Sequence, residues 1–197
     1  MAIIKPDYSL YFKFIETYAS IGYQGIDRTD PLILDLESMT ESNNQFFHIG
    51  DILRMKIFFT SRRSTQMIGI DPDDLNPYQI MEATHPDSLD RHCLARARMF
   101  KIAHDLLIAE KGNAVMSFNM RIRNPSSGYS ELLLQLLFLY SDFPCKSVLI
   151  FKVYSLLDWL EKKKRDNFCY IGKDLSFFSY PDEQMLLRGN RLSECDF

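Results

Sequence analysis

The sequence predicts an α+β fold built on an antiparallel sheet, and three observations support this. Two short β-prone segments come first, several helical segments follow, and three further β-prone segments close the pattern. The last three are separated only by short turns, as in antiparallel hairpins. Strands and helices therefore do not alternate, which argues against a parallel sheet with crossover helices. With 46% hydrophobic residues, the 197-residue chain can form a substantial core.

Two helices are expected before the first strand. Apolar residues recur at three-and-four spacing over residues 8–21, which predicts an amphipathic helix. Asp30 followed by Pro31 is typical of a helix start, with the aspartate as N-cap and the proline in the first turn. This second helix is expected to continue through Met39.

The next part of the chain is expected to form a hairpin and then three helices. Two β-prone runs flank a short polar turn, which predicts strands over 46–51 and 55–60. The helices are bounded by residues typical of helix starts and stops: Ser61 to Gly69, Asn76–Pro77 to about Ala83, and Ser88 to Lys111 before Gly112. The longest of them is expected to bury one stripe, which is Leu89, Cys93, Ala97, Phe100, His104 and Leu107.

Three strands complete the predicted sheet, over 114–123, 129–140 and 147–157. The first alternates cleanly and directs Met116, Phe118 and Met120 inward. The other two are apolar on both faces, with Gln135 and Lys152 as exceptions. A solvated antiparallel sheet is polar on one side, so both faces of this one must be covered. The outer cover is expected to be the 8–21 helix, the C-terminal tail or a second subunit.

Two stretches resemble PAS domains: "GDILRMKIFFTSRRSTQMIGIDPDDL" at 50–75 and "IMEATHPDSLDRH" at 80–92. The residues that carry the resemblance are Asp51, Ser61, Gly69, Asp74–Leu75 and His85–Pro86–Asp87. It implies a five-stranded antiparallel sheet with helices on one face, over residues 46–158. Residues 1–45 would be an N-terminal helical extension, and residues 159–197 a linker and tail.

The end of the chain, "RLSECDF", resembles the opening of a LuxR-type helix-turn-helix domain, with Leu192, Ser193 and Glu194 at the start of its first helix. The whole layout is similar to regulators with an N-terminal PAS sensor and a C-terminal DNA-binding domain. The net charge of −3 does not favour nucleic acid. DNA would therefore be bound only through a domain missing from this chain.

The PAS resemblance places a ligand pocket between the inner face of the sheet and the helices. The candidate lining residues are Met116, Phe118, Met120, Leu136, Phe138, His104 and His92. They suit a small apolar ligand, and they suit an ordinary closed core as well. No cofactor is predicted, with haem bound through His104 as a weaker alternative, because some PAS domains bind haem through a histidine of the long helix.

Residues 83–93 bring five potential metal ligands close together in sequence: His85, Asp87, Asp90, His92 and Cys93. Helical geometry separates them, because Asp90 and His92 would lie about 200° apart around the axis. The stretch is instead typical of a helix start with Asp87 as N-cap, so no metal site is predicted. Cys93 is expected to be a small core residue.

The predicted function is that of a cytoplasmic sensory domain of a transcriptional regulator, which signals by ligand- or partner-dependent repacking. There is no catalytic motif, signal peptide or membrane-spanning run, so neither an enzyme nor a membrane protein is expected. A homodimer is expected, with N-terminal helices and outer sheet faces sharing the interface. The alternative is a docking or dimerisation module with a closed core and no small ligand.

Overall fold

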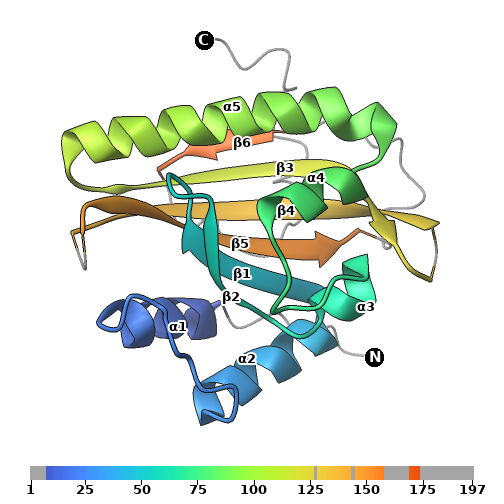
Figure 1. Ribbon diagram of the computed structural model, residues 1–197, viewed down its shortest axis with the longest axis horizontal. Coiled ribbons are helices and arrows are strands. Elements are labelled where there is room, and N and C mark those ends of the chain that lie inside the picture. Colours follow the sequence, from blue (N-terminus) through green and yellow to red (C-terminus); the bar gives the residue numbers. More distant parts are fainter. Residues whose placement is uncertain (1–7, 127, 143–144, 158–168, 174–197) are drawn as a thin grey trace.

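The computed structural model describes residues 8–126, 128–142, 145–157 and 169–173. One antiparallel sheet lies between two groups of helices, which makes the fold α+β (Figure 1). The elements in chain order are α1 (Ser9–Ala19), α2 (Pro31–Ser42), β1 (Gln45–Asp51), β2 (Lys56–Thr60), α3 (Ser64–Ile68), α4 (Pro77–Ala83), α5 (Pro86–Ala109), β3 (Asn113–Asn124), β4 (Gly128–Ser141), β5 (Ser147–Leu156) and β6 (Cys169–Gly172). From β1 to β5 this is the order of strands and helices that the sequence pattern predicts.

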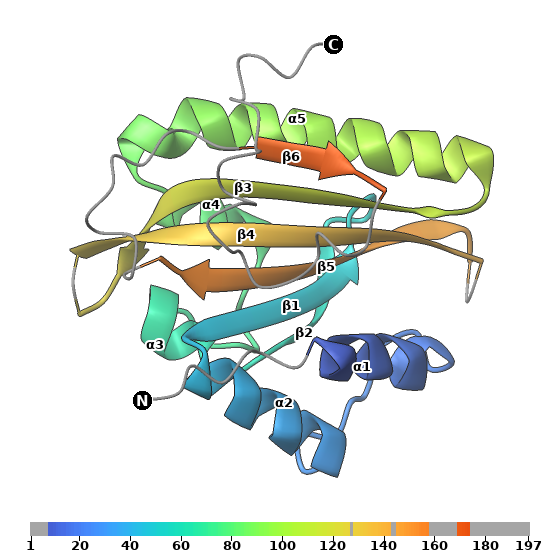
Figure 2. The same cartoon turned by 180° about the vertical axis from the view of Figure 1, so that it is seen from behind.

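The sheet has six strands rather than the expected five, in the order β2-β1-β5-β4-β3-β6. The extra strand, β6, comes from the region expected to be linker and tail, and it pairs with β3 from Val115↔Gly172 to Phe118↔Cys169. Figure 2 shows it beside β3 at the edge of the sheet. An edge strand offers unpaired backbone groups, so a short segment with little pattern of its own can add to it. The pairing of β6 with β3 therefore cannot be predicted from the periodicity of the sequence.

The inner face of the sheet, on the side of α3, α4 and α5, carries one hydrophobic core. Alternate residues of β3 and β4 point into it, as the sequence pattern predicts. They are Ala114, Met116, Phe118, Met120 and Ile122 from β3, and Leu132, Leu134, Leu136 and Phe138 from β4. The side chains of Met99 and Ala103 reach this core from α5.

A second core lies on the outer face, where α1 and α2 cover β1, β2 and β5 (Figure 1). Phe14 of α1 packs against the rings of Phe47, Phe59 and Phe151. Tyr11 of the same helix donates a hydrogen bond to the buried Gln45. The 8–21 helix, together with α2, therefore covers the outer face, and it is one of the three covers that the sequence left open.

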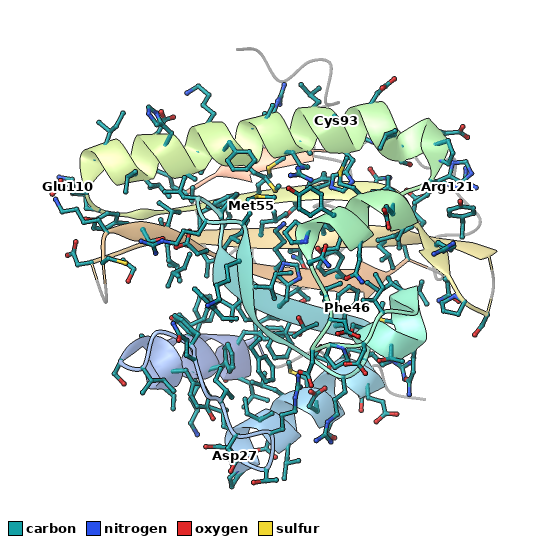
Figure 3. All side chains as sticks on the ribbon, in the orientation of Figure 1. Asp27, Phe46, Met55, Cys93, Glu110 and Arg121 are labelled. Atoms are coloured by element: carbon teal, nitrogen blue, oxygen red, sulfur yellow. The ribbon has the colours of Figure 1, made fainter. Side chains whose placement is uncertain are left out.

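The buried face of α5 differs from the predicted stripe by one position. The buried residues are Ser88, His92, Ala95, Met99 and Ala103, whereas Leu89, Cys93 and His104 are exposed. Figure 3 places Cys93 on α5, where its side chain is exposed. Hydrophobicity alone predicts the wrong face, because Ser88 and His92 are polar residues that obtain hydrogen bonds inside the fold.

Two predicted helix caps are also wrong. The N-cap of α5 is His85 rather than Asp87, because the His85 ring accepts the bond from the Asp87 backbone N–H and Pro86 begins the helix. Ser61 does not cap α3, since its hydroxyl accepts from the backbone N–H of Phe47 at 2.9 Å and so joins the end of β2 to β1.

Gly69 ends α3 in the left-handed conformation, with φ of 73°. A Cβ atom at this position would lie 2.7 Å from Cγ of Pro125, on the β3–β4 turn. Gly25 has a similar φ of 62° with nothing within 4 Å. Alanine would have a strained backbone at both positions, but only at position 69 would it also collide with a neighbouring residue. Comparing the two substitutions therefore separates the cost of backbone strain from the cost of the steric contact.

We expect Gly69→Ala to lower the free energy of unfolding by about 2 kcal/mol, and Gly25→Ala by about 1 kcal/mol. Both variants force alanine into the left-handed region, but only the first also displaces Pro125. Urea denaturation of both proteins measures the difference. Equal losses of unfolding free energy in the two variants would mean that the β3–β4 turn can move away from the new methyl group at little cost, and that α3 does not depend on its contact with Pro125.

Candidate functional site

A cavity of about 50 Å³ lies inside the inner core, between the centre of the sheet, α4, α5 and the β1–β2 hairpin. Its apolar walls come from all of these parts and include Met55, Ile57, Ile80, Met99, Phe100, Phe118, Leu134 and Ile150. A single water needs roughly 10–15 Å³ measured in this way, so the cavity has room for a few waters or one very small molecule.

Asp51 shapes the hairpin that closes one side of the cavity. Its buried carboxylate accepts hydrogen bonds from the backbone N–H groups of Leu53 and Arg54, both at 2.9 Å, and from the hydroxyl of Ser147 at 2.5 Å. Met55 follows with a positive φ of 55°, which is uncommon outside glycine. Figure 3 shows Met55 at the tip of this hairpin. Asp51, the last residue of β1, therefore stabilises a tight turn, and this turn places Met55 at the cavity.

The polar part of the cavity wall is strongly basic. His48 of β1 and Lys152 of β5 are direct cross-strand partners and share the inner face. His92 and Arg96 face them from α5, and Lys56 lies at the same cavity. Asp51 is the one acidic residue among the described cavity residues, and its carboxylate is already engaged by the hairpin, Ser147 and Arg54.

These basic groups repel one another, and their pKa values show it. The pKa of Lys152 is lowered from 10.5 to about 8, first by burial and then by the charge of Arg96. The pKa of His92 is lowered to about 3, by burial and then by Lys152 and Arg96. Burial and Lys152 also hold the pKa of His48 well below 6.5. At neutral pH both histidines are therefore neutral, and Lys152 and Arg96 carry the positive charge.

Two buried polar atoms at the cavity have no hydrogen-bond partner within the described part of the chain. They are Nδ1 of His48, which is 2% exposed as a residue, and the hydroxyl of Tyr154, which is 0% exposed. The ring of Tyr154 stacks on Phe46 at 4.2 Å, so its position is fixed by packing. Burying such groups without partners costs free energy, and native proteins rarely do so without a reason.

His92 is held in place by Thr84. Nδ1 of His92 lies 2.8 Å from the Thr84 hydroxyl, which also lies 2.9 Å from the backbone carbonyl of Ile80. A threonine hydroxyl has one proton, so both contacts are satisfied when it donates to Ile80 and accepts from a protonated Nδ1. This arrangement fixes a neutral imidazole with its other nitrogen unprotonated.

Acid is expected to destabilise the protein through His92. Its native pKa is lowered, so between pH 6.5 and about 3 the unfolded chain binds a proton there that the native chain does not. Stability therefore falls as the pH falls through this window. In His92→Gln the fall should be shallower, by up to about 1.4 kcal/mol per pH unit between pH 6 and 4. Urea denaturation at several pH values measures this.

His104→Gln is the matched control, because His104 is on the same helix and exposed. We expect this variant to keep the acid-dependent loss of stability that His92 causes. A wild-type slope in His92→Gln would mean that His92 takes up its proton in the native state.

The sequence-predicted pocket residues divide into three groups. His92 and Phe118 line the cavity. Met116, Met120, Leu136 and Phe138 are buried in the surrounding core but do not line it. His104 is exposed on α5 and does not line the cavity, so this cavity does not support haem ligation through His104. At about 50 Å³ the cavity is small beside pockets for drug-sized ligands, which measure about 300–1,000 Å³.

Sequence reasoning missed His48, Arg96, Lys152 and Tyr154 as site residues. The signal for two of them was present, because His48 and Lys152 interrupt strands that are otherwise apolar, in "FFHIGD" and "LIFKVY". A charged side chain inside a strand with two buried faces needs a partner or a function. Only the register of β1 on β5 shows that these two interruptions meet.

The ligand-rich stretch at residues 83–93 is a junction between α4 and α5. Throughout the described residues, no group of three or more His, Cys, Asp or Glu side chains is arranged to hold a metal ion. No helix among the same residues has the length and hydropathy needed to cross a membrane.

The chain is similar to known proteins only in comparison with solved structures. No protein-family model and no curated protein sequence matches the chain. A PAS-B domain of Drosophila melanogaster Cycle with bound ethylene glycol is similar over 57% of this chain and 99% of its own, with 17% identity and a TM-score of 0.39. A sensory box histidine kinase/response regulator from Burkholderia thailandensis is similar over 64% of this chain and 87% of its own, with 13% identity and a TM-score of 0.41.

An RNA-binding light-oxygen-voltage receptor is similar over 61% of this chain, with 15% identity and a TM-score of 0.40. The similar region spans 31% of that receptor. The N-terminal domain of a diguanylate cyclase with a PAS/PAC sensor, from Marinobacter aquaeolei, is similar over 56% of this chain and 94% of its own, with 9% identity and a TM-score of 0.38. The fold class itself rests on the strand pairing and core packing of this chain.

Proposed function

We propose that this chain is a PAS-like sensory domain of a transcriptional regulator, and that a small molecule bound in the cavity changes the packing between the sheet and its helices. The observation that carries the proposal is a cavity at the centre of the inner face whose wall contains buried polar atoms without partners, on His48 and Tyr154. A closed structural core has no need of such atoms. A ligand would satisfy them.

A route for the signal is supported by the contacts of β1 and β5. Both strands contribute to the cavity on the inner face and to the packing of α1 on the outer face. Phe151 packs against Phe14 of α1, and the next residue, Lys152, lines the cavity. A shift of β5 on ligand binding would therefore change the packing of α1 against the sheet. We propose that α1 and the outer face pass the signal to a second copy of the chain in a homodimer.

The experiment is native mass spectrometry of the protein purified from cells, followed by release of any bound molecule under denaturing conditions. We expect a small molecule bound to each folded chain. Met99→Phe should abolish this extra mass, because Met99 lines the cavity and the larger ring would fill it. Met116→Phe is the matched control, since Met116 lies in the same core away from the cavity.

Hydrogen exchange then tests the sensory step. Protein stripped of its small molecule should exchange faster in the β1–β2 hairpin and α4 than the loaded protein. A protein that takes up no small molecule from cell extract, and instead binds a partner protein equally well as wild type and as Met99→Phe, would contradict the proposal. That result would favour a docking module with a closed core.

A further inference from the structure

The chemistry of the cavity narrows the class of ligand. Most of its wall is apolar, and apart from Asp51 its charged side chains are basic. Lys152 and Arg96 have no ion-pair partner among the described residues, and the pKa of Lys152 is displaced by burial and by Arg96, with no acidic group among its causes. Both side chains are half-buried, and a cation that is partly withdrawn from water is costly unless a counter-charge accompanies it.

The cavity cannot obtain that counter-charge from Asp51. Its carboxylate is held by two backbone N–H groups, the Ser147 hydroxyl and the guanidinium of Arg54, which lies 2.7 Å away. These bonds build the hairpin, so turning Asp51 toward Lys152 would dismantle it. Among the described residues, no acidic side chain is therefore left to match the positive charge of Lys152 and Arg96.

We infer that the cavity binds a short-chain carboxylate, whose carboxylate group is neutralised by Lys152 and Arg96 and accepts a hydrogen bond from the Tyr154 hydroxyl. This rests on the proposed function and names its ligand class. The apolar end of the molecule lies among Met99, Phe118 and Leu134. The cavity of about 50 Å³ sets the size, since it suits a molecule of a few heavy atoms.

The apolar walls favour an organic anion over inorganic phosphate. A phosphate presents oxygen on every side and carries up to two charges at neutral pH, so it would bury polar surface against the hydrocarbon of this site. A carboxylate carries one charge at one end. It matches a cavity whose wall combines cations on the sheet and α5 with apolar side chains such as Met99, Phe118 and Leu134.

The site predicts that affinity depends on pH in a defined direction. Binding needs a protonated Lys152, so affinity should fall by up to tenfold per pH unit above about pH 8. The charged and titratable residues that surround Lys152 at the cavity are His48 and Asp51 on β1, Lys56 on β2, His92 and Arg96 on α5, and Tyr154 on β5. The pKa values of both histidines are already lowered, so they stay neutral between pH 7 and 9.

The experiment uses the full chain, stripped of any co-purified molecule, and measures the midpoint of thermal unfolding. The probes are acetate, propionate and butyrate, their amides acetamide, propionamide and butyramide, and inorganic phosphate. We expect at least one carboxylate to raise the midpoint by about 5 °C at a concentration a hundredfold above its Kd. The matching amide and phosphate should have little effect.

Lys152→Met keeps an unbranched side chain of similar volume, one atom shorter, and removes its charge. It should reduce carboxylate affinity at least tenfold by calorimetry, whereas Lys101→Met, the same change at an exposed position of α5, should not. Equal binding of carboxylate and amide, or equal carboxylate affinity in Lys152→Met and wild type, would overturn the inference. So would the absence of any response to carboxylates.

The outcomes also separate this inference from the proposed function. A neutral apolar molecule found in the purified protein, and lost in Met99→Phe, would support a sensory cavity and overturn its assignment to carboxylates. A protein with no cavity ligand of any kind would overturn both.

Discussion

Replacing Phe14 with alanine is expected to lower the free energy of unfolding by about 3–5 kcal/mol. Phe14 is 0% exposed and meets the rings of Tyr18, Phe47, Phe59 and Phe151, with centroids 5.2–5.9 Å apart. Truncation removes the buried ring and leaves a cavity between α1 and the sheet. Partners on three strands (β1, β2 and β5) and on α1 itself cannot all move to fill it. Urea denaturation measures the loss.

Phe12→Ala is the matched control on the same helix, because Phe12 is only partly buried. We expect it to cost about 1 kcal/mol. Phe14→Ala should in addition expose apolar sheet surface, seen as stronger binding of a hydrophobic dye at temperatures below the unfolding transition. A loss below about 1 kcal/mol in Phe14→Ala would mean that α1 is not docked on the outer face in solution.

Replacing Lys152 with methionine is expected to stabilise the ligand-free protein by about 3 kcal/mol at pH 7. The native pKa of Lys152 is about 8, whereas the value in the unfolded chain is near 10.5. The difference between these pKa values corresponds to about 3 kcal/mol that the charged lysine costs the native state below pH 8. Methionine has a similar shape without the charge, so the cost disappears.

The sign of the pH dependence follows from the same difference. Between pH 8 and 10.5 the unfolded chain retains a proton on Lys152 that the native chain has lost, so wild-type stability gains a rising contribution with increasing pH. Lys152→Met lacks this contribution. Its stability advantage over the wild type should therefore shrink across this window. Urea denaturation at pH 7, 8, 9 and 10 follows the advantage.

Lys101→Met controls for the loss of a lysine as such, since Lys101 is exposed and pairs with Asp105 at 2.8 Å. Its stability should stay within about 0.5 kcal/mol of the wild type at pH 7. A destabilised Lys152→Met would show that the ammonium makes a favourable interaction inside the native protein. The expected gain in unfolding free energy would instead show that the wild-type protein is less stable because it keeps a charged lysine at a binding site.

Local signals were enough to predict most of the elements. The three-and-four spacing in α1, the Asp30–Pro31 start of α2 and the left-handed Gly69 at the end of α3 are all present in the structure. The alternation of Met116, Phe118 and Met120 predicts their common face. These predictions succeed because each depends on residues within one or two turns, or on the two-residue period of a strand.

The face of α5 could not be predicted in this way. Leu89 and Cys93 look more hydrophobic than Ser88 and His92, yet they are exposed and the polar pair is buried. Ser88 accepts hydrogen bonds from the Arg121 backbone and the Arg91 side chain, and His92 bonds to Thr84. Partners supplied by another element remove the cost of burying a polar group. Such partners are invisible to a hydrophobic pattern.

The sequence by itself determined the fold class, the order of elements from β1 to β5 and the need for cover on both faces of the sheet, because periodicity and turn chemistry are local. The tertiary structure alone decided that β6 joins the edge, that His92 rather than His104 faces the interior, and that His48 and Lys152 meet across β1 and β5. That meeting depends on strand register, which joins residues far apart in the chain. The candidate site is formed by residues that are far apart in the sequence and close together in the fold. Its basic side chains come from different strands and from α5, so the sequence alone does not show that they share one site.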